Sequence, residues 1–429
     1  MATQAPGFRD VIVVGAGPAG LLLALLLARS NIPVTVIEQS PELDHRARAT
    51  HYGPPAMAEL NRAGVGDDLR AQGFHPDGVC WRKLDGTPIA RIDGTATRGD
   101  PDDMVCLPLA PLQKILRNHL EKYDGAKIIF NYNVVGLGQS DERAWVDVET
   151  PDGKKKLEAD YIVGCDGANS QVRRSLFGDW EFPGRTWNEQ IVATNTYYNF
   201  EPYKWMDSNF IIDPEHWYMA AKIDKDGLYR ITYGEKPGLT DEQLRERLPW
   251  KFKSMLPGHP EPSEYKVVNF APYKVHQRLA KAMRVGRFLL AADAAHLCNP
   301  FGGLGLTGGI VDVGGLHDCL RGMYENKADE TILDKYNEVR RKAYTEFVDV
   351  NSSAWFRRMF ELDPDRALEV DQFLQLLNKA ETDPDLKKQL QRGMRALAHD
   401  FTQYYGEVTK GTKSTHPETT ATMIPPNPA

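Results

Sequence analysis

Three glycines near the start of the chain have the spacing of a phosphate-binding turn. Gly15, Gly17 and Gly20 directly follow the β-branched run Val11–Val14, and an uninterrupted apolar run over residues 21–28 follows them. The first glycine allows a tight turn out of a buried strand, the second lets a pyrophosphate approach the backbone, and the third lets strand and helix pack closely. A helix that begins here presents free N–H groups and its positive dipole end to the phosphates.

An acidic residue completes this pattern. A second β-branched run, residues 34–37, ends at Glu38. A carboxylate at this place accepts hydrogen bonds from ribose hydroxyls and argues against a ribose 2′-phosphate. The order of strand, glycines, helix, strand and acid predicts a dinucleotide site whose ligand is either FAD or NAD. The alternative is a chance glycine-rich turn.

Two later strands also end in an aspartate. Residues 161–163 lead to Asp166, which needs polar partners if it is buried: a cofactor hydroxyl, or the helix cap of a simple Asp-Gly turn. Residues 287–291 lead to Asp293, and a glycine-bearing loop and a helix from about Leu306 follow. Such a loop lets the backbone approach a flat ring, and the helix directs N–H groups at developing negative charge.

Other candidate residues carry weaker signals. Arg46 and Arg48 lie in the polar loop after the dinucleotide unit, where they either reach phosphates or are solvated surface arginines. No residue stands out as a catalytic base. His216, His276 and Tyr218 are candidates, each with a structural role as the alternative.

Composition narrows the class of protein. The 429 residues predict two domains, and a net charge of −7 excludes a global basic field for nucleic acid. Five scattered cysteines without a C-x-x-C pair favour reduced thiols over disulfides or metal ligands. The start of the chain has no apolar signal core, and the run over residues 21–28 is too short to span a bilayer. We therefore expect a soluble cytoplasmic protein without a membrane span or a bound metal.

Changes in pattern along the chain divide it into an α/β domain and a second, antiparallel domain. We assign residues 1–75, 106–180 and 276–350 to a Rossmann-like domain and residues 76–105 and 181–275 to a substrate domain built on an antiparallel sheet. Residues 351–406 are expected to form C-terminal helices, and residues 407–429 a mobile tail. Expected helices cover residues 56–69, 109–123, 331–350 and 364–401.

The second domain is dense in aromatic residues. An aromatic sheet face can line an apolar ligand pocket, but an ordinary core is the usual role of such residues. None of them is singled out as a ligand contact. They are Trp187, Tyr197, Tyr198, Phe200, Tyr203, Trp205, Phe210, Trp217, Tyr218, Tyr229 and Tyr233.

The three motifs together resemble the single-component FAD-dependent aromatic hydroxylases, the class of para-hydroxybenzoate and salicylate hydroxylases. The resemblance runs from about residue 10 to 346 and rests on Gly15-x-Gly17-x-x-Gly20, on Cys165-Asp166-Gly167, and on Gly286 to His296 with the following glycines. It implies a glutathione-reductase-type FAD-binding domain that holds FAD tightly but without a covalent bond, and NADPH or NADH as a transient co-substrate.

The resemblance also implies roles for individual residues. Glu38 binds the adenosine ribose, and Arg48 contacts the pyrophosphate. Asp166 lies in a motif associated with both FAD and NAD(P)H, Asp293 binds the ribityl chain, and Pro300 lies near the substrate. The full implied set is Gly15, Gly17, Ala19, Gly20, Glu38, Arg46, Arg48, Asp166, Asp293, Gly303, Gly305, Leu306 and Thr307, the backbone of the last two facing the flavin pyrimidine edge.

Four positions depart from the family's pattern. Ala292 stands where glycine is usual, Leu304 where a polar residue is common, Thr307 where asparagine is common, and Leu109 where glutamine or arginine is common. These departures bear on the FAD geometry and argue against assuming a phenolic substrate.

The predicted function is therefore a flavin monooxygenase. By the resemblance, NAD(P)H and O2 produce a flavin C4a-hydroperoxide that transfers one oxygen atom to an aromatic or polyketide-like substrate. Hydroxylation is the main prediction for this transfer. A homodimer is a further prediction. The alternatives are epoxidation or Baeyer–Villiger insertion in secondary metabolism, a non-oxygenating flavoprotein reductase, and a colourless NAD-binding protein. A halogenase is disfavoured because its Trp-x-Trp-x-Ile-Pro motif is absent.

Overall fold

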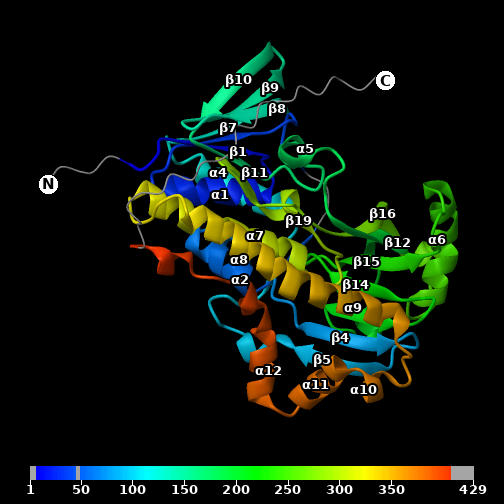
Figure 1. Cartoon of the computed structure of the whole chain (residues 1–429). Coiled ribbons are helices and arrows are strands. Elements are labelled where there is room, and N and C mark those ends of the chain that lie inside the picture. The colour runs from blue at the N-terminus through cyan, green and yellow to red at the C-terminus, as the bar shows by residue number, and fades with distance from the viewer. Residues whose placement is uncertain (1–5, 45–48, 407–429) are drawn as a thin grey trace.

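The computed structural model describes residues 6–44 and 49–406 and contains two large sheets (Figure 1). Arg46, Arg48 and the predicted tail 407–429 lie outside the described residues. The first sheet has six strands, all parallel to their neighbours except the edge pair β17–β18. In spatial order they are β17 (Arg284–Val285), β18 (Phe288–Leu290), β11 (Tyr161–Gly164), β1 (Val11–Val14), β2 (Val34–Ile37) and β7 (Ala126–Ile129).

Three helices lie on one side of this sheet. They are α1 (Pro18–Arg29), α4 (Leu109–Leu120) and α7 (Leu304–Tyr324), and α1 contacts both of the others. A meander of β8 (Asn133–Gln139), β9 (Ala144–Thr150) and β10 (Gly153–Ala159) stands on the opposite side (Figure 1). The layers are therefore helices, parallel sheet and meander.

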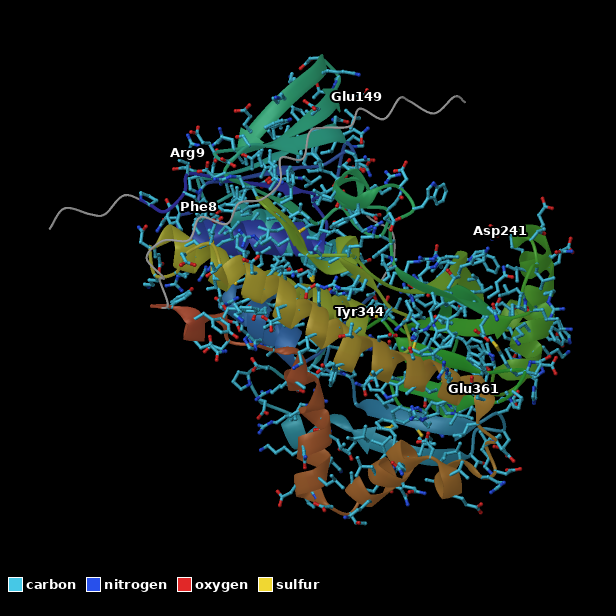
Figure 2. All side chains as sticks on the ribbon, viewed as in Figure 1. Phe8, Arg9, Glu149, Asp241, Tyr344 and Glu361 are labelled. Carbon is cyan, nitrogen blue, oxygen red and sulfur yellow. The ribbon has the colours of Figure 1, made fainter. Side chains whose placement is uncertain are left out.

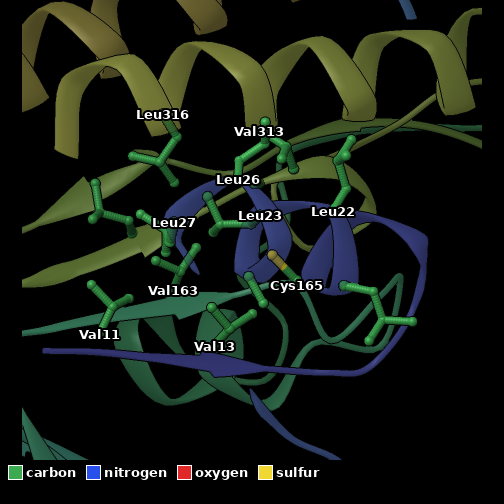
Figure 3. Packing of buried hydrophobic residues seen from close by; sticks show 14 of the residues in the cluster. Val11, Val13, Leu22, Leu23, Leu26, Leu27, Val163, Cys165, Val313 and Leu316 are labelled. Carbon is green, nitrogen blue, oxygen red and sulfur yellow. The ribbon is translucent and has the colours of Figure 1, made fainter. Parts of the chain in front are cut away.

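The helix α1 is apolar on all sides because it is buried between the sheet and α7. Leu22, Leu23, Leu26 and Leu27 are 0–2% exposed, and Figure 3 shows them between Val11 and Val13 of β1 and Val313 and Leu316 of α7. A helix without a polar face is typical of such a sandwiched position.

The second sheet has eight strands, antiparallel except where β13 pairs with β4. The helix α6 (Asp241–Met255) packs on one face through Leu244, Phe252 and Met255. The last strands of the sheet extend past residue 275. In spatial order the strands are β19 (His296–Leu297), β16 (Lys266–Leu279), β12 (Gly184–Tyr197), β15 (Leu228–Glu235), β14 (Tyr218–Lys222), β13 (Ser208–Ile212), β4 (Gly78–Lys83) and β5 (Pro88–Asp93).

Several expected helices are divided. The helix predicted over residues 56–69 is two helices, α2 (Pro54–Arg62) and α3 (Gly66–Gln72), because Gly64 between them has φ +76°. The region before α2 holds a short strand, β3 (His51–Tyr52), paired with β6 (Val105–Cys106). Residues 332–361 run through α8 (Ile332–Ala343), a π-helical turn and α9 (Asp349–Glu361).

The C-terminal region is also a series of short helices instead of one long one. They are α10 (Ala367–Val370), α11 (Gln372–Ala380), α12 (Pro384–Gln391) and 3-10 helices at Gly393–Leu397 and Phe401–Tyr404. In Figure 1, α11 lies against β5, and α12 packs on α11 and on the 3-10 helix Gly94–Thr97 that follows β5. None of the helices in the described ranges is both long and apolar enough to cross a membrane.

Candidate active site

A cavity of about 1900 Å³ lies between the two sheets. Ligand pockets usually hold roughly 300–1,000 Å³. The space is therefore large enough for a dinucleotide together with a second, smaller molecule.

The turn from β1 into α1 forms one wall of this cavity. Gly15 has φ +104°, and a Cβ on Gly20 would overlap the carbonyl oxygen of Gly15. Gly17 is the N-cap of α1, no side chain caps the helix there, and a Cβ on Gly17 would meet nothing within 4 Å. The helix thus presents uncapped N–H groups toward open space, as a phosphate site requires.

Glu38 is fixed beside this turn at the end of β2. Its Oε2 accepts a hydrogen bond from the N–H of Ala16 (2.8 Å), and its Oε1 accepts one from Ser40 (2.9 Å). The carboxylate lines the cavity with its orientation set by the backbone. Further lone pairs remain for a ribose hydroxyl, since each carboxylate oxygen accepts more than one hydrogen bond.

Asp166 both caps a helix and lines the cavity. Its carboxylate accepts hydrogen bonds from Ser170 Oγ (2.5 Å) and from the N–H of Val172 (3.1 Å), at the start of α5 (Gln171–Phe177). Burial raises the pKa of Asp166 despite these hydrogen bonds. The helix cap weighed as the alternative is therefore present, in a position that also faces a ligand.

Arg173 ties this turn to the third motif. Its Nη2 donates to the carbonyl of Ala168 (2.9 Å) and its Nη1 to the carbonyl of Ala294 (3.0 Å). The two aspartate turns are thereby held at a fixed separation across the cavity.

The helix α7 supplies a second uncapped N-terminus. It begins at Leu304, two residues before the expected start, because Gly303 adopts φ +63° as its N-cap and no side chain caps it. Leu306 and Thr307 in its first turn line the cavity, and Thr307 Oγ1 accepts a hydrogen bond from the N–H of Gly53 (3.3 Å). Two positive helix ends, of α1 and α7, therefore face the same space.

A buried ion cluster lies behind the loop that leads to α7. Asp312 in α7 bonds His296 Nε2 (2.7 Å) and Arg340 Nε (2.7 Å), and the three side chains are at most 3% exposed. Burial alone would raise the pKa of Asp312, but His296 and Arg340 outweigh it and lower this pKa. The hydroxyl of Tyr344, labelled in Figure 2, adds a hydrogen bond to the carbonyl of Leu297 (2.8 Å). The loop is thus anchored from beneath.

The structure brings most of the sequence-predicted site residues to one cavity. Gly20 packs beneath the turn and does not line it, and Arg46 and Arg48 fall outside the described ranges. The residues that line it are Gly15, Gly17, Ala19, Glu38, Asp166, Asp293, Pro300, Gly303, Gly305, Leu306 and Thr307.

His216 and Tyr218 do not line the cavity. Tyr218 points to the other face of the eight-stranded sheet, where it is fully buried with Phe252 in the core under α6. His216 Nδ1 lies 3.3 Å from the Nζ atom of Lys251, which belongs to α6. Neither residue is therefore retained as a catalytic candidate, whereas His276 does line the cavity.

The sheet face that lines the other half of the cavity was not identified from the sequence. Of the eleven aromatic residues considered, Phe210 alone lines it, and the others pack elsewhere. Strand alternation could have identified this face from the sequence, because alternate residues of a strand point to opposite faces. In β14, Met219 and Ala221 face the cavity while Tyr218 and Ala220 face the core. The main contributors from the sheet are Trp81, Phe210, Met219, Ala221, Arg230, Asn269, Ala271 and Tyr273.

The C-terminal helices close one side of this half. Gln389, Leu390, Gln391, Gly393 and Met394 line the cavity, and so does Gly94 on the segment after β5. Three ion pairs join the two segments, which we call the C-terminal latch. They are Lys387–Asp93 (2.9 Å), Arg392–Asp100 (2.5 Å) and Arg395–Asp102 (3.3 Å).

Two of the cysteines, Cys165 and Cys298, line the cavity. All five cysteines are free. No group of His, Cys, Asp and Glu side chains suited to a metal ion occurs within residues 6–44 and 49–406.

Comparisons with known proteins agree with this arrangement. The model of the FAD binding domain family matches residues 9–351. Para-nitrophenol 4-monooxygenase from Pseudomonas sp. strain WBC-3 is 38% identical over 363 residues, which are 84% of this chain and 90% of that protein. A 6-hydroxy-3-succinoylpyridine 3-monooxygenase from Pseudomonas putida strain S16 is 35% identical, over 82% of this chain and 90% of that protein.

Solved structures show the same relationship. The crystal structure of p-nitrophenol 4-monooxygenase PnpA from Pseudomonas putida DLL-E4 superposes with a TM-score of 0.85 at 35% identity, covering 91% of this chain and 98% of that one. Aklavinone-11 hydroxylase, solved with FAD and aklavinone, has a TM-score of 0.72 at 24% identity, over 83% of this chain and 70% of that one, and so supports the fold alone.

Proposed function

The chain belongs to the family of FAD-dependent aromatic hydroxylases, and from that premise we propose that it hydroxylates an electron-rich aromatic ring, such as a phenol, with NAD(P)H and O2 as co-substrates. The observation that carries the proposal is the pair of uncapped helix N-termini, of α1 and α7, at one cavity. This pair suits an extended dinucleotide such as FAD, which carries negative charge on its pyrophosphate and, when reduced, on its flavin ring.

The described residues fit FAD. The turn at Gly15–Ala19 would hold the pyrophosphate, since a side chain at Gly17 would occupy space that is open. Glu38 would bind the adenosine ribose and Asp293 the ribityl chain, while the N–H groups near Leu306 and Thr307 would face the pyrimidine edge of the flavin. Bound FAD supplies the redox chemistry that passes electrons from a reduced nicotinamide to O2 and one oxygen atom to the substrate.

The protein itself supplies position, charge and dryness. The N-terminus of α7 would stabilise negative charge on a reduced flavin ring, and the cluster of Asp312, His296 and Arg340 holds the preceding loop in place. Apolar side chains such as Phe210 and Met219 surround the adjoining space and exclude water from it. In this proposal Pro300 lies at the boundary between the ring and the substrate.

The number of dinucleotide-binding turns indicates how the nicotinamide co-substrate would bind. Among the described residues, the β1–α1 turn is the one glycine turn of this spacing that directly follows a strand of the parallel sheet, and we assign it to FAD; Gly303-x-Gly305-x-x-Gly308 repeats the spacing at the start of α7 without such a strand. NADH or NADPH would therefore dock transiently. Cytoplasmic location and a homodimer stay predictions, to be checked by fractionation and by size-exclusion chromatography with light scattering.

Hydroxylation is favoured over the other oxygen transfers. The two relatives with 35–38% identity over most of both chains are named as monooxygenases of a nitrophenol and a hydroxypyridine. Epoxidation and Baeyer–Villiger insertion find no such support. A polyketide-like substrate would rest on the fold-level likeness to aklavinone-11 hydroxylase alone.

The test is a visible spectrum of the purified protein, followed by NADH and NADPH oxidation with and without O2 in the presence of 4-nitrophenol and related phenols. We expect a flavin spectrum that bleaches with one nicotinamide and recovers with O2, and a product that gains one ¹⁸O atom from ¹⁸O2. A colourless protein that cannot be reconstituted with FAD would overturn the proposal. Reoxidation that yields only hydrogen peroxide with every phenol would argue against hydroxylation.

A further inference from the structure

Arg230 lies in the middle of the sheet face that lines the cavity. It belongs to β15, between Asn195 of β12 and Ala221 of β14. Its neighbour Ile231 points the other way, into the core under α6. Strand alternation therefore directs the Arg230 side chain toward the ligand space, which it lines.

The charge of Arg230 has no acidic partner. Its Nε and Nη2 both donate to Asn195 Oδ1 at 3.1 Å, and no carboxylate forms an ion pair with it in the described part of the chain. The ionisable groups that act on it most are Tyr273 and Cys106, and burial raises the pKa of each to about 12, so both are neutral near pH 7. A partly buried guanidinium is normally balanced by an anion, because desolvation of an unpaired charge is costly.

Arg173 provides a contrast within the same molecule. It too lacks a carboxylate, but its guanidinium donates to two backbone carbonyls and lies 3.7 Å from the ring centre of Phe182. Those contacts satisfy the group internally. Among the residues that the structure describes, Arg230 has a single amide oxygen as its partner, so its remaining donors are available to a ligand.

Two further polar groups line the cavity. His51 lines it, and its Nε2 is buried without a hydrogen-bond partner, while Nδ1 lies 2.9 Å from Thr50 Oγ1. Burial, and then Arg230, lower the pKa of His51 to about 4, so its ring is neutral. Tyr273 also lines the cavity, 39% exposed, with its hydroxyl protonated.

His51 lies near Arg230, because Cys106 Sγ is 3.9 Å from His51 Nδ1 and 3.5 Å from the carbonyl oxygen of Lys222, on the strand paired with that of Arg230. Arg230, His51 and Tyr273 give the cavity one cation and two neutral hydrogen-bonding groups amid apolar walls that include Phe210 and Met219. That combination suits a flat apolar ring with one negatively charged oxygen substituent.

We propose that Arg230 is the specificity-determining residue of this site: it pairs with a negatively charged oxygen substituent of the aromatic substrate, to which the neighbouring His51 also hydrogen-bonds. The proposal rests on the proposed aromatic hydroxylase function and names the substrate class of that same site. The shared chemistry is an anionic oxygen on an aromatic ring, which either a phenolate or an aromatic carboxylate supplies.

The test uses the FAD-loaded protein and the change in its flavin spectrum on ligand binding. Two pairs of probes separate charge from shape: 4-nitrophenolate against 4-nitroaniline, and benzoate against benzamide. Wild type, Arg230→Gln and Arg230→Lys are compared. Arg245→Gln is the matched control, because Arg245 is exposed and stacks on Phe270 on the opposite face of the same sheet.

We expect Arg230→Gln to weaken binding of one anionic probe about 10- to 100-fold, the range of a charge-assisted hydrogen bond, and to change binding of its neutral partner less than about twofold. The pair that responds identifies phenolate or carboxylate as the group recognised. Arg230→Lys, which keeps the charge, is expected to restore most of the affinity, and Arg245→Gln to bind as wild type does.

Equal losses for charged and neutral probes would overturn the inference, and so would unchanged binding. Unaltered probe binding with slower flavin reduction would place the charge of Arg230 at the flavin instead of the substrate. These outcomes differ from failure of the proposed function, in which the wild-type protein binds no FAD or hydroxylates no aromatic compound. If Arg230→Gln fails to fold, Arg230→Met, which also removes the charge but keeps a long side chain, takes its place in the same comparison of charged and neutral probes.

Discussion

The backbone N–H of Ala292 donates to Asp312 Oδ2 at 3.0 Å, and this hydrogen bond holds Ala292 at φ +56°. Alanine in that left-handed region costs about 1–2 kcal/mol, because its Cβ crowds the following carbonyl. The family's usual residue here is glycine, which has no such cost. The loop that leads to α7 therefore keeps a strained residue under the control of a buried carboxylate.

Replacing Ala292 with glycine is expected to relieve this strain. Ala292→Gly should leave the protein as stable or up to about 1 kcal/mol more stable, since relief of the left-handed conformation offsets the added entropy of the unfolded chain. Ala295→Gly, three residues on at φ −94°, is the control and should destabilise. Urea denaturation of the two variants measures the difference, and an equal loss in both would contradict the strain argument.

A substitution in α7 tests the packing around Ala292. A Cβ added at Gly309 would lie 2.7 Å from Ala292 Cβ, which is closer than real Cβ contacts allow. Gly309→Ala should destabilise wild type by about 1–3 kcal/mol through overpacking, and should cost less in the Ala292→Gly background. Additive losses in the double variant would show that the two residues do not touch.

Removal of the buried carboxylate should be far more damaging. Asp312→Asn leaves Arg340 and His296 without their anion, so we expect a loss of about 3–5 kcal/mol in unfolding free energy and weaker FAD retention. Glu325→Gln at the end of the same helix removes the surface ion pairs with Arg321 and Lys327 and should cost about 1 kcal/mol or less. Thermal unfolding followed by flavin fluorescence compares them. Similar losses in both variants would refute a special role for Asp312.

Two glycines of the β1–α1 turn should fail in different ways. Gly17→Val is expected to fold normally but to lose most of its FAD, because its side chain would enter open cavity space at an extended backbone position. Gly20→Val should fail to fold, because its Cβ would overlap the carbonyl of Gly15. Circular dichroism and the ratio of flavin to protein absorbance separate these cases. A yellow, stable Gly17→Val protein would contradict the assignment of the pyrophosphate to this turn.

The C-terminal latch should respond to charge reversal. Asp100→Arg replaces the anion beside Arg392 with a second cation, and the repulsion should open this wall of the cavity. We therefore expect faster quenching of flavin fluorescence by iodide and a loss of up to about 1 kcal/mol in stability. The double variant Asp100→Arg/Arg392→Asp restores opposite charges and should return quenching toward the wild-type value. If the double variant behaves like the single one, the ion pair does not hold this wall of the cavity closed.

Acid sensitivity should include a contribution from His51. Its folded pKa of about 4 lies below the ordinary value of 6.5, so between these two values the unfolded chain holds a proton that the folded chain does not. Stability therefore falls as pH drops through this window, by up to about 1.4 kcal/mol per pH unit. Arg230, Asp207 and Cys106 are the charged or titratable groups near this ring.

The variant His51→Gln should show a shallower fall in unfolding free energy between about pH 7 and about pH 5 than wild type does. His259→Asn, at an exposed turn, is the control and should keep the wild-type slope. Equal slopes in wild type and His51→Gln would mean that His51 titrates normally in the folded protein.

Local chemistry explains what the sequence predicts well. The turn from Gly15 to Gly20 and the acid at Glu38 are specified by residues within one β-α-β unit, and the structure builds them as such a unit. The predicted ends of helices were less accurate where the left-handed backbone of a single glycine sets them. Gly64 divides one expected helix into two, and Gly303 starts α7 early.

The half of the cavity that is lined by the eight-stranded sheet depends on contacts that no local pattern contains. Arg230 and His51 come from segments about 180 residues apart, and the C-terminal latch joins residues that are nearly 300 apart. His51 also lies in a two-residue strand that pairs with Cys106, in a stretch read as a polar loop. Aromatic density drew attention to residues such as Tyr218, whose ring faces the core instead.

The burial of α1 beneath α7 has a consequence for synthesis of the protein. The chain leaves the ribosome from its N-terminus, so the apolar helix Pro18–Arg29 emerges long before residues 304–324 that cover it. At about 5–20 residues per second, the interval is roughly 15–60 seconds. For that time the nascent chain exposes a run of leucines that would bind other apolar surfaces. We therefore expect production of this protein to depend on chaperones that shield the first helix until translation is nearly complete.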